Sequence, residues 1–150
     1  MWIEWSVKAS LLRYVASMSD GAYEAFDGAE IRPASFRWPC VADPGEGRAR
    51  QVFRARGSVV LRGHGGLLYL PLTRPTVTVE AGAGTLAIDF PWASTGPEPP
   101  LEIATVSLLP DPGEGERLAA AVQLTEDGAE LFRAYPAGES MDHLFVTAVS

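Results

Sequence analysis

Short hydrophobic runs separated by turn residues make up most of this chain. The 15 glycines and 12 prolines concentrate in clusters at 43–47, 63–66, 81–84, 96–100 and 110–115. Between the clusters, β-branched or alternating runs typical of strands lie at 51–61, 67–72, 76–80, 86–90, 101–108, 118–124 and 143–149. The run at 118–124 contains three successive alanines that also suit a helix, but its place between strand-like runs favours a strand. This pattern predicts a mainly β fold, an antiparallel β-sandwich or partly open barrel with two packed sheets.

Two segments have helical spacing instead, which adds two short α-helices to the predicted fold. In segment 6–18, with Ser6 as the expected N-cap, the apolar positions share one helix face, and they are Val7, Leu11, Tyr14, Val15 and Met18. Segment 126–135 has Thr125 as its expected N-cap, two acidic residues in its first turn and Pro136 after its last residue. We therefore expect Tyr14 to point inward from the first helix.

Composition sets the size of the core and the role of the single cysteine. The chain is 47% hydrophobic and 21% charged, which suits one domain over residues 1–150 whose core needs neither a disulfide nor a structural metal. Cys40 cannot pair within the chain. Its neighbours have strand character, so we expect an inert, partly buried thiol rather than a reactive one.

Charge and hydropathy exclude two classes of partner. The net charge of −7 has the wrong sign for a nucleic-acid-binding surface. The longest apolar runs, 67–72 and 103–109, are far shorter than a membrane span of ~20 residues. The first residues lack the basic and apolar pattern of a signal peptide. We expect a cytoplasmic location for the chain as written, and the cell surface if it is a domain excised from a longer protein.

Two residues are candidates for chemistry. The sequence has no G-x-S-x-G, H-E-x-x-H, P-loop or G-x-G-x-x-G motif, and its two histidines are too few for a histidine-built metal site. An inward Tyr14 needs a partner for its hydroxyl. His64 lies among glycines, where the backbone can approach another group closely. Each also has an ordinary interpretation, as a core tyrosine and as a turn histidine.

Four segments, in order along the chain, match one family pattern. The run W-S-V-K-A-S-L-L-R-Y at 5–14 resembles W-x-V-K-x-S-x-x-x-Y, and F-R-W-P at 36–39 resembles F-R-F-P. The run V-V-L-R-G-H-G-G-L-L at 59–68 resembles V-x-F-x-G-H-x-G-x-L, with Leu61 in place of the phenylalanine. Near the C-terminus, L-T-E-D-G-A followed by Y-P-A-G-E and M-D resembles L-T-x-x-G-A and Y-x-A-G-x-x-L-D. These are motifs of the haem-transport-associated (HtaA) domain, found in bacterial surface proteins that capture haem.

The resemblance implies a haem-binding module with a tyrosine ligand. In that family the tyrosine of the first helix holds ferric iron and a histidine supports it, which carries over to Tyr14 and His64. Ferric protoporphyrin IX is then the expected cofactor, with another haem-carrying protein as a partner. A phenolate suits hard ferric iron, but a free phenol has a pKa of ~10, so the metal charge and a hydrogen bond must help it to ionise. An imidazole N–H can supply that bond.

Other polar and aromatic residues invite weaker hypotheses. Alternate positions of one predicted strand carry Arg48, Arg50, Arg54 and Arg56. They form either a solvated face, the reading we favour, or a partner for the haem propionates. Ser17 and Ser19 could also meet a propionate. Trp38, Phe132 and Tyr135 could pack on a porphyrin, although such aromatics usually lie in a core. His143 has no counterpart in the family pattern, and we expect it on the surface.

The sequence therefore predicts a haem-binding module for transport, transfer or buffering, and not an enzyme. Two alternatives remain open. One is a haem-processing enzyme, which would need an open iron face and a proton donor. The other is a haem-free protein-interaction domain whose sheet edge pairs with a partner.

Overall fold

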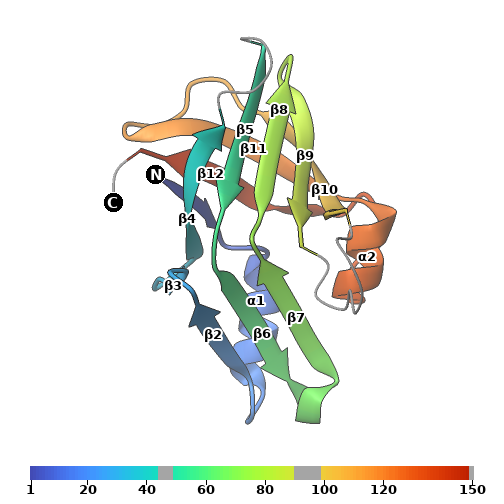
Figure 1. Ribbon diagram of the computed structural model, residues 1–150. Coiled ribbons are helices and arrows are strands. Elements are labelled where there is room, and N and C mark those ends of the chain that lie inside the picture. The colour runs from blue at the N-terminus through green and yellow to red at the C-terminus, as the bar shows by residue number, and fades with distance from the viewer. Residues whose placement is uncertain (44–48, 90–98, 149–150) are drawn as a thin grey trace.

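The computed structural model describes residues 1–43, 49–89 and 99–148, and strands dominate it (Figure 1). The first half of the chain contains β1 (Trp2–Trp5), α1 (Ala9–Ser17), β2 (Ala22–Phe26), β3 (Glu30–Ile31), β4 (Phe36–Asp43), β5 (Arg50–Ala55), β6 (Ser58–Gly63), the 3-10 turn η1 (His64–Gly66) and β7 (Leu68–Thr73). The second half contains β8 (Thr76–Glu80), β9 (Ala83–Ile88), β10 (Leu101–Leu108), β11 (Glu116–Leu124), α2 (Glu126–Phe132) and β12 (Ser140–Thr147).

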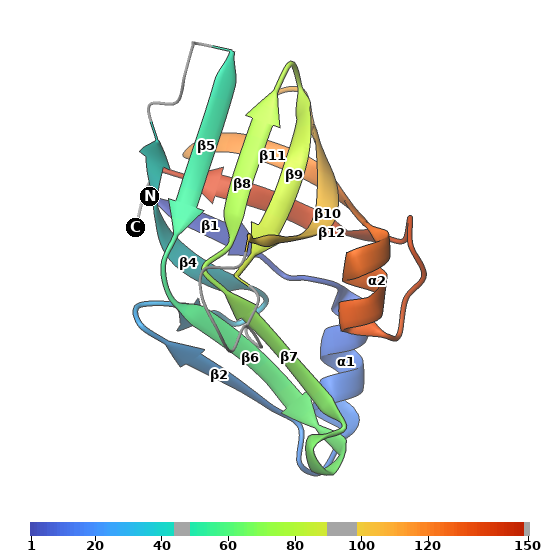
Figure 2. The same cartoon turned by 45° about the vertical axis from the view of Figure 1, so that its right-hand side comes forward.

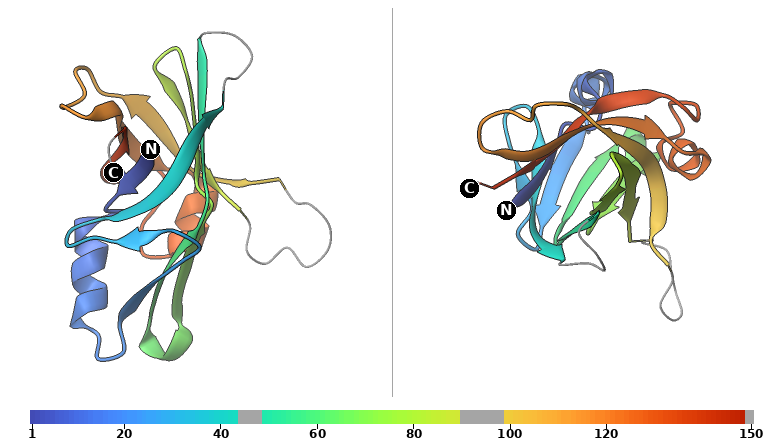
Figure 3. Two further views of the ribbon diagram at one scale, coloured as in Figure 1. Left: turned by 60° about the vertical axis from the view of Figure 1, so that its left-hand side comes forward. Right: turned by 90° about the horizontal axis from the view of Figure 1, so that it is seen from above.

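The larger sheet closes on itself as a barrel. Its nine strands have the order β1-β12-β11-β10-β9-β8-β5-β4-β3, and β1 also pairs with β4, from Trp2 opposite Pro39 to Trp5 opposite Phe36. This second pairing joins eight strands into a ring, with β3 attached outside it at β4. Figure 3 (right) shows the strands from above, curving around a shared interior. The predicted mainly β, antiparallel fold with two short helices is confirmed, and the large sheet takes the barrel form, closed by β1.

A three-stranded antiparallel sheet, β2-β6-β7, extends from one end of the barrel, with α1 running alongside it (Figures 1 and 2). The chain passes from the barrel to this sheet at Gly57, which has a φ of +91°. A side chain there would start 2.8 Å from the carbonyl oxygen of Phe26. The single strand expected over 51–61 is therefore divided into β5 and β6, one in each sheet.

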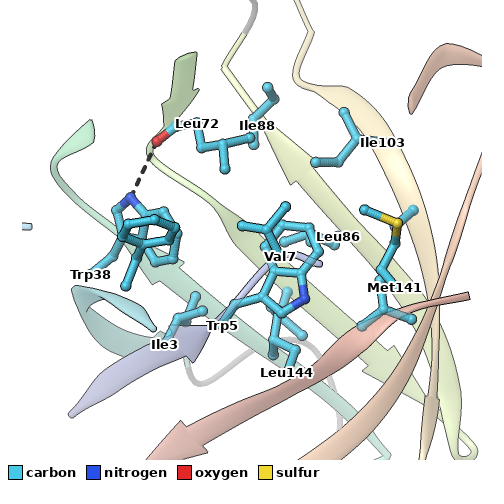
Figure 4. Packing of buried hydrophobic residues seen from close by; sticks show 14 of the residues in the cluster. Ile3, Trp5, Val7, Trp38, Leu72, Leu86, Ile88, Ile103, Met141 and Leu144 are labelled. Atoms are coloured by element: carbon cyan, nitrogen blue, oxygen red, sulfur yellow. Dashed lines mark hydrogen bonds between the residues drawn. The ribbon is translucent and has the colours of Figure 1, made fainter. Parts of the chain in front are cut away.

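One hydrophobic core joins the two sheets and both helices. Trp38 of β4 is 1% exposed, and its indole Nε1 donates a 3.2 Å hydrogen bond to the carbonyl oxygen of Leu72 in β7 (Figure 4). A barrel strand is thereby tied to the smaller sheet. Cys40 of the same strand is 7% exposed, as expected, and burial raises the pKa of its thiol to about 11.

The first helix is shorter than its hydrophobic spacing predicts. It begins at Ala9, with Lys8 rather than Ser6 as the N-cap residue. Val7, at a φ of +65°, stays with the barrel, because its carbonyl oxygen accepts a hydrogen bond from the amide of Asp142. Ser6 donates its hydroxyl to the Asp142 carboxylate over 2.8 Å instead of capping the helix. The buried residues of α1 are Leu11 and Val15, and the partly buried Leu12 also packs against the core.

The second helix has the predicted start and an earlier end. The hydroxyl of Thr125 accepts a 3.0 Å hydrogen bond from the amide of Gly128, so the predicted cap is confirmed. The helix stops at Phe132 rather than at residue 135, because Arg133 takes a left-handed φ of +64°.

Several strand predictions also change. The predicted runs missed β1, β2 and β3, and β4 was indicated only by the strand character around Cys40 and by the F-R-W-P motif. The pattern also placed a turn at 81–84, where β9 already begins at Ala83. Glycine at 84 allows this, since a Cβ there would lie 1.7 Å from the carbonyl oxygen of Thr78. The ambiguous run at 118–124 is the strand β11, as predicted. Residue 90, residue 149, Arg48 and most of the clusters at 43–47 and 96–100 lie outside the described residues.

Candidate functional site

The fold brings Tyr14 and His64 into direct contact. Tyr14 lies in α1, and His64 begins the turn η1 between β6 and β7. The Tyr14 hydroxyl oxygen is 2.6 Å from Nε2 of His64. The two ring centroids are 5.5 Å apart, and the ring planes are tilted by 56°. Two residues separated by 50 positions in the sequence therefore form one hydrogen-bonded pair.

Glycines allow the end of α1 to approach the small sheet. A Cβ at Gly63, the last residue of β6, would lie 2.4 Å from the sulfur of Met18. A Cβ at Gly21 would lie 1.9 Å from the carbonyl oxygen of Val15, where the chain turns away from the helix. The contact at Gly21 is with backbone, so a larger residue there would disturb the end of α1, whereas the contact at Gly63 is with the flexible Met18 side chain. The absence of a side chain at Gly63 leaves room for Met18 beside the base of the turn.

The backbone of the turn is unusual at His64 itself. His64 has a φ of +51°, followed by +61° at Gly65 and +96° at Gly66. Holding a residue other than glycine in the left-handed region costs on the order of 1 kcal/mol or more. The carboxylate of Asp20 accepts hydrogen bonds from the amides of His64 (3.0 Å) and Gly65 (2.7 Å). The Gly65 bond is the largest cause that lowers the pKa of the Asp20 carboxyl, and the His64 amide adds to it.

Tyr14 does not point into the core as its helical spacing predicts. Its side chain is 49% exposed. The reason is that α1 packs through Leu11 and Val15, which leaves Tyr14 at the edge of that face, toward the hairpin. The prediction of a buried phenol was wrong, and its hydroxyl is paired at the surface by His64.

Tyr14 and His64 line an open groove of about 1180 Å³ between the β6–β7 hairpin, the start of β10 and α2. Its described lining is Tyr14, His64, Gly66, Leu67, Leu68, Tyr69, Leu101, Asp127, Glu130, Leu131, Phe132, Arg133 and Ala134. Pockets for small molecules and cofactors typically measure ≈ 300–1,000 Å³. The groove is thus large enough for a ligand of cofactor size.

The groove has an exposed apolar wall beside the Tyr14–His64 pair. Leu67 is 87% exposed, although leucine is among the residues most often buried, and Tyr69 is 44% exposed. Arg133 brings a cation to the groove, and it forms no ion pair with any residue in the described ranges. The described lining thus combines apolar surface with one guanidinium cation, Arg133, and two carboxylates, Asp127 and Glu130.

The remaining candidates lie elsewhere or serve the core. Arg50 and Arg54 of β5 and Arg56 directly after it are exposed, in keeping with the favoured solvated face, and Arg54 forms a 3.1 Å ion pair with Asp43. Trp38 is buried in the core, whereas Phe132 is 4% exposed and also borders the groove. The three polar candidates Ser17, Ser19 and His143 are exposed and are not among the described residues that line the groove.

Tyr135 lies beyond the end of α2 and is not among the described lining residues either. Its hydroxyl is 2.8 Å from the hydroxyl of Ser10 on α1. Tyr135 therefore links the two helices at the edge of the molecule.

Asp20 was missed by the sequence analysis, as were the groove residues Leu67, Tyr69 and Arg133. Asp20 stands directly after the helical segment, where its position signals only a helix end. Its partners are main-chain amides rather than side chains, so the residue types in the sequence do not indicate the two hydrogen bonds.

Two features are absent from the part of the chain that the structure describes. Within residues 1–43, 49–89 and 99–148, no three histidine, cysteine or acidic side chains gather in a way that could hold a bare metal ion. In the same ranges, no helix is both long enough and apolar enough to cross a membrane.

Comparisons with known proteins assign the chain to a family. The family model HtaA, described as Htaa, matches residues 2–147, whereas no curated protein matches the sequence. The C-terminal domain of HtaA from Corynebacterium glutamicum has a similar structure, with a TM-score of 0.76, 20% identity and coverage of 96% of this chain and 92% of that chain.

Two other solved structures from the same organism agree. The haem-binding protein HtaB gives a TM-score of 0.71 at 21% identity, covering 98% of this chain and 91% of that chain. The N-terminal domain of HtaA gives 0.75 at 17% identity, covering 99% and 97%. The fold is shared with all three, and the match of the family model over nearly the whole length shows that this chain belongs to the HtaA family.

Proposed function

We propose that this domain binds one ferric haem in the groove, with the Tyr14 oxygen as the iron ligand and His64 as the group that supports it. The hydrogen bond between Tyr14 and His64 at the edge of a large, partly apolar groove is the observation that carries this proposal. Membership of the HtaA family and the likeness to a solved haem-binding protein add support. HtaA domains are binding modules rather than enzymes, so the proposed role is to hold haem and pass it on.

The residues present fit this ligand. Ferric iron is a hard Lewis acid that accepts a phenolate oxygen, and tyrosine is a known haem ligand. Because Tyr14 is half exposed, its oxygen is accessible from the groove without any change in the core. Leu67 and Tyr69 offer apolar surface to a macrocycle, and Arg133 offers a cation to its carboxylates. Haem would supply the iron, Tyr14 would supply the ligand oxygen, and Leu67, Tyr69 and Arg133 would contact the macrocycle and its carboxylates.

His64 has a defined task in this arrangement. Its Nε2 lies within hydrogen-bond distance of the Tyr14 oxygen. With the proton on Nε2, the ring donates to that oxygen and stabilises it as an anion. The same bond fixes the direction of the phenol ring, as partners of metal ligands generally do. Without His64, the Tyr14 oxygen would still be present, but the phenol ring would lose its fixed direction and the phenolate anion would lose part of its stabilisation.

Titration of the apoprotein with hemin tests the proposal through the visible spectrum. The unaltered chain should bind one hemin and show a high-spin ferric spectrum with a tyrosinate charge-transfer band. Tyr14→Phe should lose this band and tight binding. Tyr69→Phe, which removes another exposed phenol from the same groove, should keep the band. His64→Ala should weaken binding less than Tyr14→Phe, by about 10–100-fold as for other partners of metal ligands.

The outcomes separate the alternatives. If the spectrum of the unaltered chain shows no saturable change on addition of hemin, the result favours a haem-free interaction domain. Equal affinity in Tyr14→Phe and the unaltered chain would refute the ligand assignment. Incubation of the complex with a reductant and oxygen should return intact haem, and loss of the bound haem would instead support a haem-processing enzyme.

A further inference from the structure

Asp20 links the end of α1 to the turn that carries His64. Its two carboxylate oxygens accept the amides of His64 and Gly65 over 3.0 and 2.7 Å. Asp20 lies six positions after Tyr14, on the same continuous segment of chain. We propose that Asp20 is a positioning residue which holds His64 against Tyr14, so that the pair is assembled before any ligand binds. This inference rests on the proposed function for its ligand, but not for its geometry.

The turn needs such a support because packing does not provide one. A Cβ added at Gly65 or Gly66 would meet nothing within 4 Å among the described atoms. His64 itself occupies a left-handed conformation that side chains other than glycine rarely adopt. Within the turn, the amide of Leu67 bonds to the carbonyl oxygen of His64 over 3.1 Å. Met18, directly after α1, packs beside Gly63 at the base of the turn, while the Asp20 bonds and the Tyr14–His64 bond hold the tip itself.

The carboxylate is suited to this task. Hydrogen bonds to an ionised acceptor are about twice as strong as those between neutral groups. Two neighbouring amides that point at the two oxygens of one carboxylate fix both the position and the rotation of the turn. The amide of Gly21 also bonds to the carbonyl oxygen of Met18 over 3.2 Å, which holds Asp20 close to the helix end. Tyr14 and Asp20, which supports His64, therefore lie on one short segment of the chain and keep a fixed spacing.

A double-mutant cycle with hemin as the probe distinguishes positioning from general stabilisation. Asp20→Ala should weaken hemin binding by about 10–100-fold, as His64→Ala does, and should reduce the tyrosinate band. Asp20→Asn keeps one acceptor oxygen and should give an intermediate loss. In a His64→Ala background, Asp20→Ala should change the affinity by less than about twofold, because Asp20 acts through His64. Ser19→Ala, an exposed neighbour, should bind hemin like the unaltered chain.

An unliganded measurement keeps this test separate from the proposed function. In the apoprotein, NMR should detect the proximity of the Tyr14 and His64 rings and slow exchange of the Gly65 amide, and both should be lost in Asp20→Ala. The proposal is overturned if both signals survive in that variant, if Asp20→Ala binds hemin like the unaltered chain, or if the same loss persists in the His64→Ala background. Failure of hemin to bind the unaltered chain would refute the proposed function, while the apoprotein signals would still decide the role of Asp20. If Asp20→Ala does not fold, Asp20→Asn carries the same comparisons.

Discussion

At the scale of single residues, exposure separates side chains that can meet a ligand from those that only pack. Cys40 is 7% exposed, and its pKa of about 11 keeps the thiol protonated near neutral pH, so it is a packing residue. Tyr14 is 49% exposed, and its hydroxyl is already oriented by His64. The proposed site therefore consists of partly exposed groups at the edge of the core.

Asp20 should make stability depend on pH in the acid range. Its pKa is lowered in the folded state, so its contribution is fully present above its ordinary value of 3.8 and is lost as the pH falls through the folded value. The difference in unfolding free energy between the unaltered chain and Asp20→Asn should be constant at neutral pH and shrink below that value. Urea unfolding at a series of pH values measures it. A difference that does not change with pH would contradict the assigned bonds.

The sequence could supply the candidate pair but not its setting. Tyr14 and His64 could be predicted because each stands at a position of a family motif that is recognisable in the sequence. The inward orientation of Tyr14 was wrong, because five apolar positions were read as one helix face, and Val7 and Met18 lie outside the helix. The role of Asp20 could not be predicted, because its partners are main-chain amides more than 40 positions away and every residue type except proline has such an amide.

At the scale of elements, α2 is held on the barrel by direct backbone contact. The amide of Thr125 bonds to the carbonyl oxygen of Ile103, and its hydroxyl bonds to the carbonyl oxygen of Glu102 in β10. A Cβ at Gly128 would lie 2.0 Å from the same Ile103 oxygen. Because Leu131, Phe132 and Arg133 follow in the groove wall, this contact also sets the width of the groove.

Gly128→Ala should reverse the usual preference for alanine in helices. Alanine favours a helix by about 1 kcal/mol over glycine, but here the added carbon meets backbone rather than the end of a flexible side chain. We expect a net loss of about 1–3 kcal/mol in unfolding free energy, together with weaker hemin binding. Gly113→Ala is the matched control, since its Cβ meets only the end of the Glu116 side chain. Increased stability of Gly128→Ala would show that α2 lies farther from β10.

Strand prediction succeeded where turns punctuate the chain and failed where a strand changes sheet. The run 51–61 reads as continuous because strand-like residues, among them Val52, Phe53 and Val59, occur in both halves, yet Gly57 turns the chain from one sheet to the other. The short strands β1, β2 and β3 are set by their partners rather than by their own patterns.

At the scale of the whole molecule, four residues at the start of the chain complete the barrel. β1 pairs with β12 on one side and with β4 on the other. Ile3 is fully buried between Val146 and Trp38, which are its partners in those two strands. Closure thus depends on contacts between the first and last strands, which no local pattern in the sequence can reveal.

Ile3→Ala should therefore cost about 2–5 kcal/mol, as for other large-to-small changes in a core. For a chain of this size, each kcal/mol lowers the melting temperature by roughly 2–4 °C. Glu4→Ala, on the neighbouring position of the same strand and only half-buried, should stay within about 0.5 kcal/mol. Thermal and urea unfolding of both variants measure the difference. Equal stability of the two would mean that β1 is dispensable for closure.

The pairing of β1 with β12, with Trp2 opposite Thr147, also places the entry and exit of the fold side by side. Both ends lie at the side of the barrel, away from the β6–β7 hairpin tip at the bottom of the molecule (Figure 1). A short linker could join the two ends and new ones could be opened in a surface loop, giving a circular permutant with the same barrel. By the same geometry, the domain could be grafted as a cassette into a loop of a host protein and still present its groove to the solution.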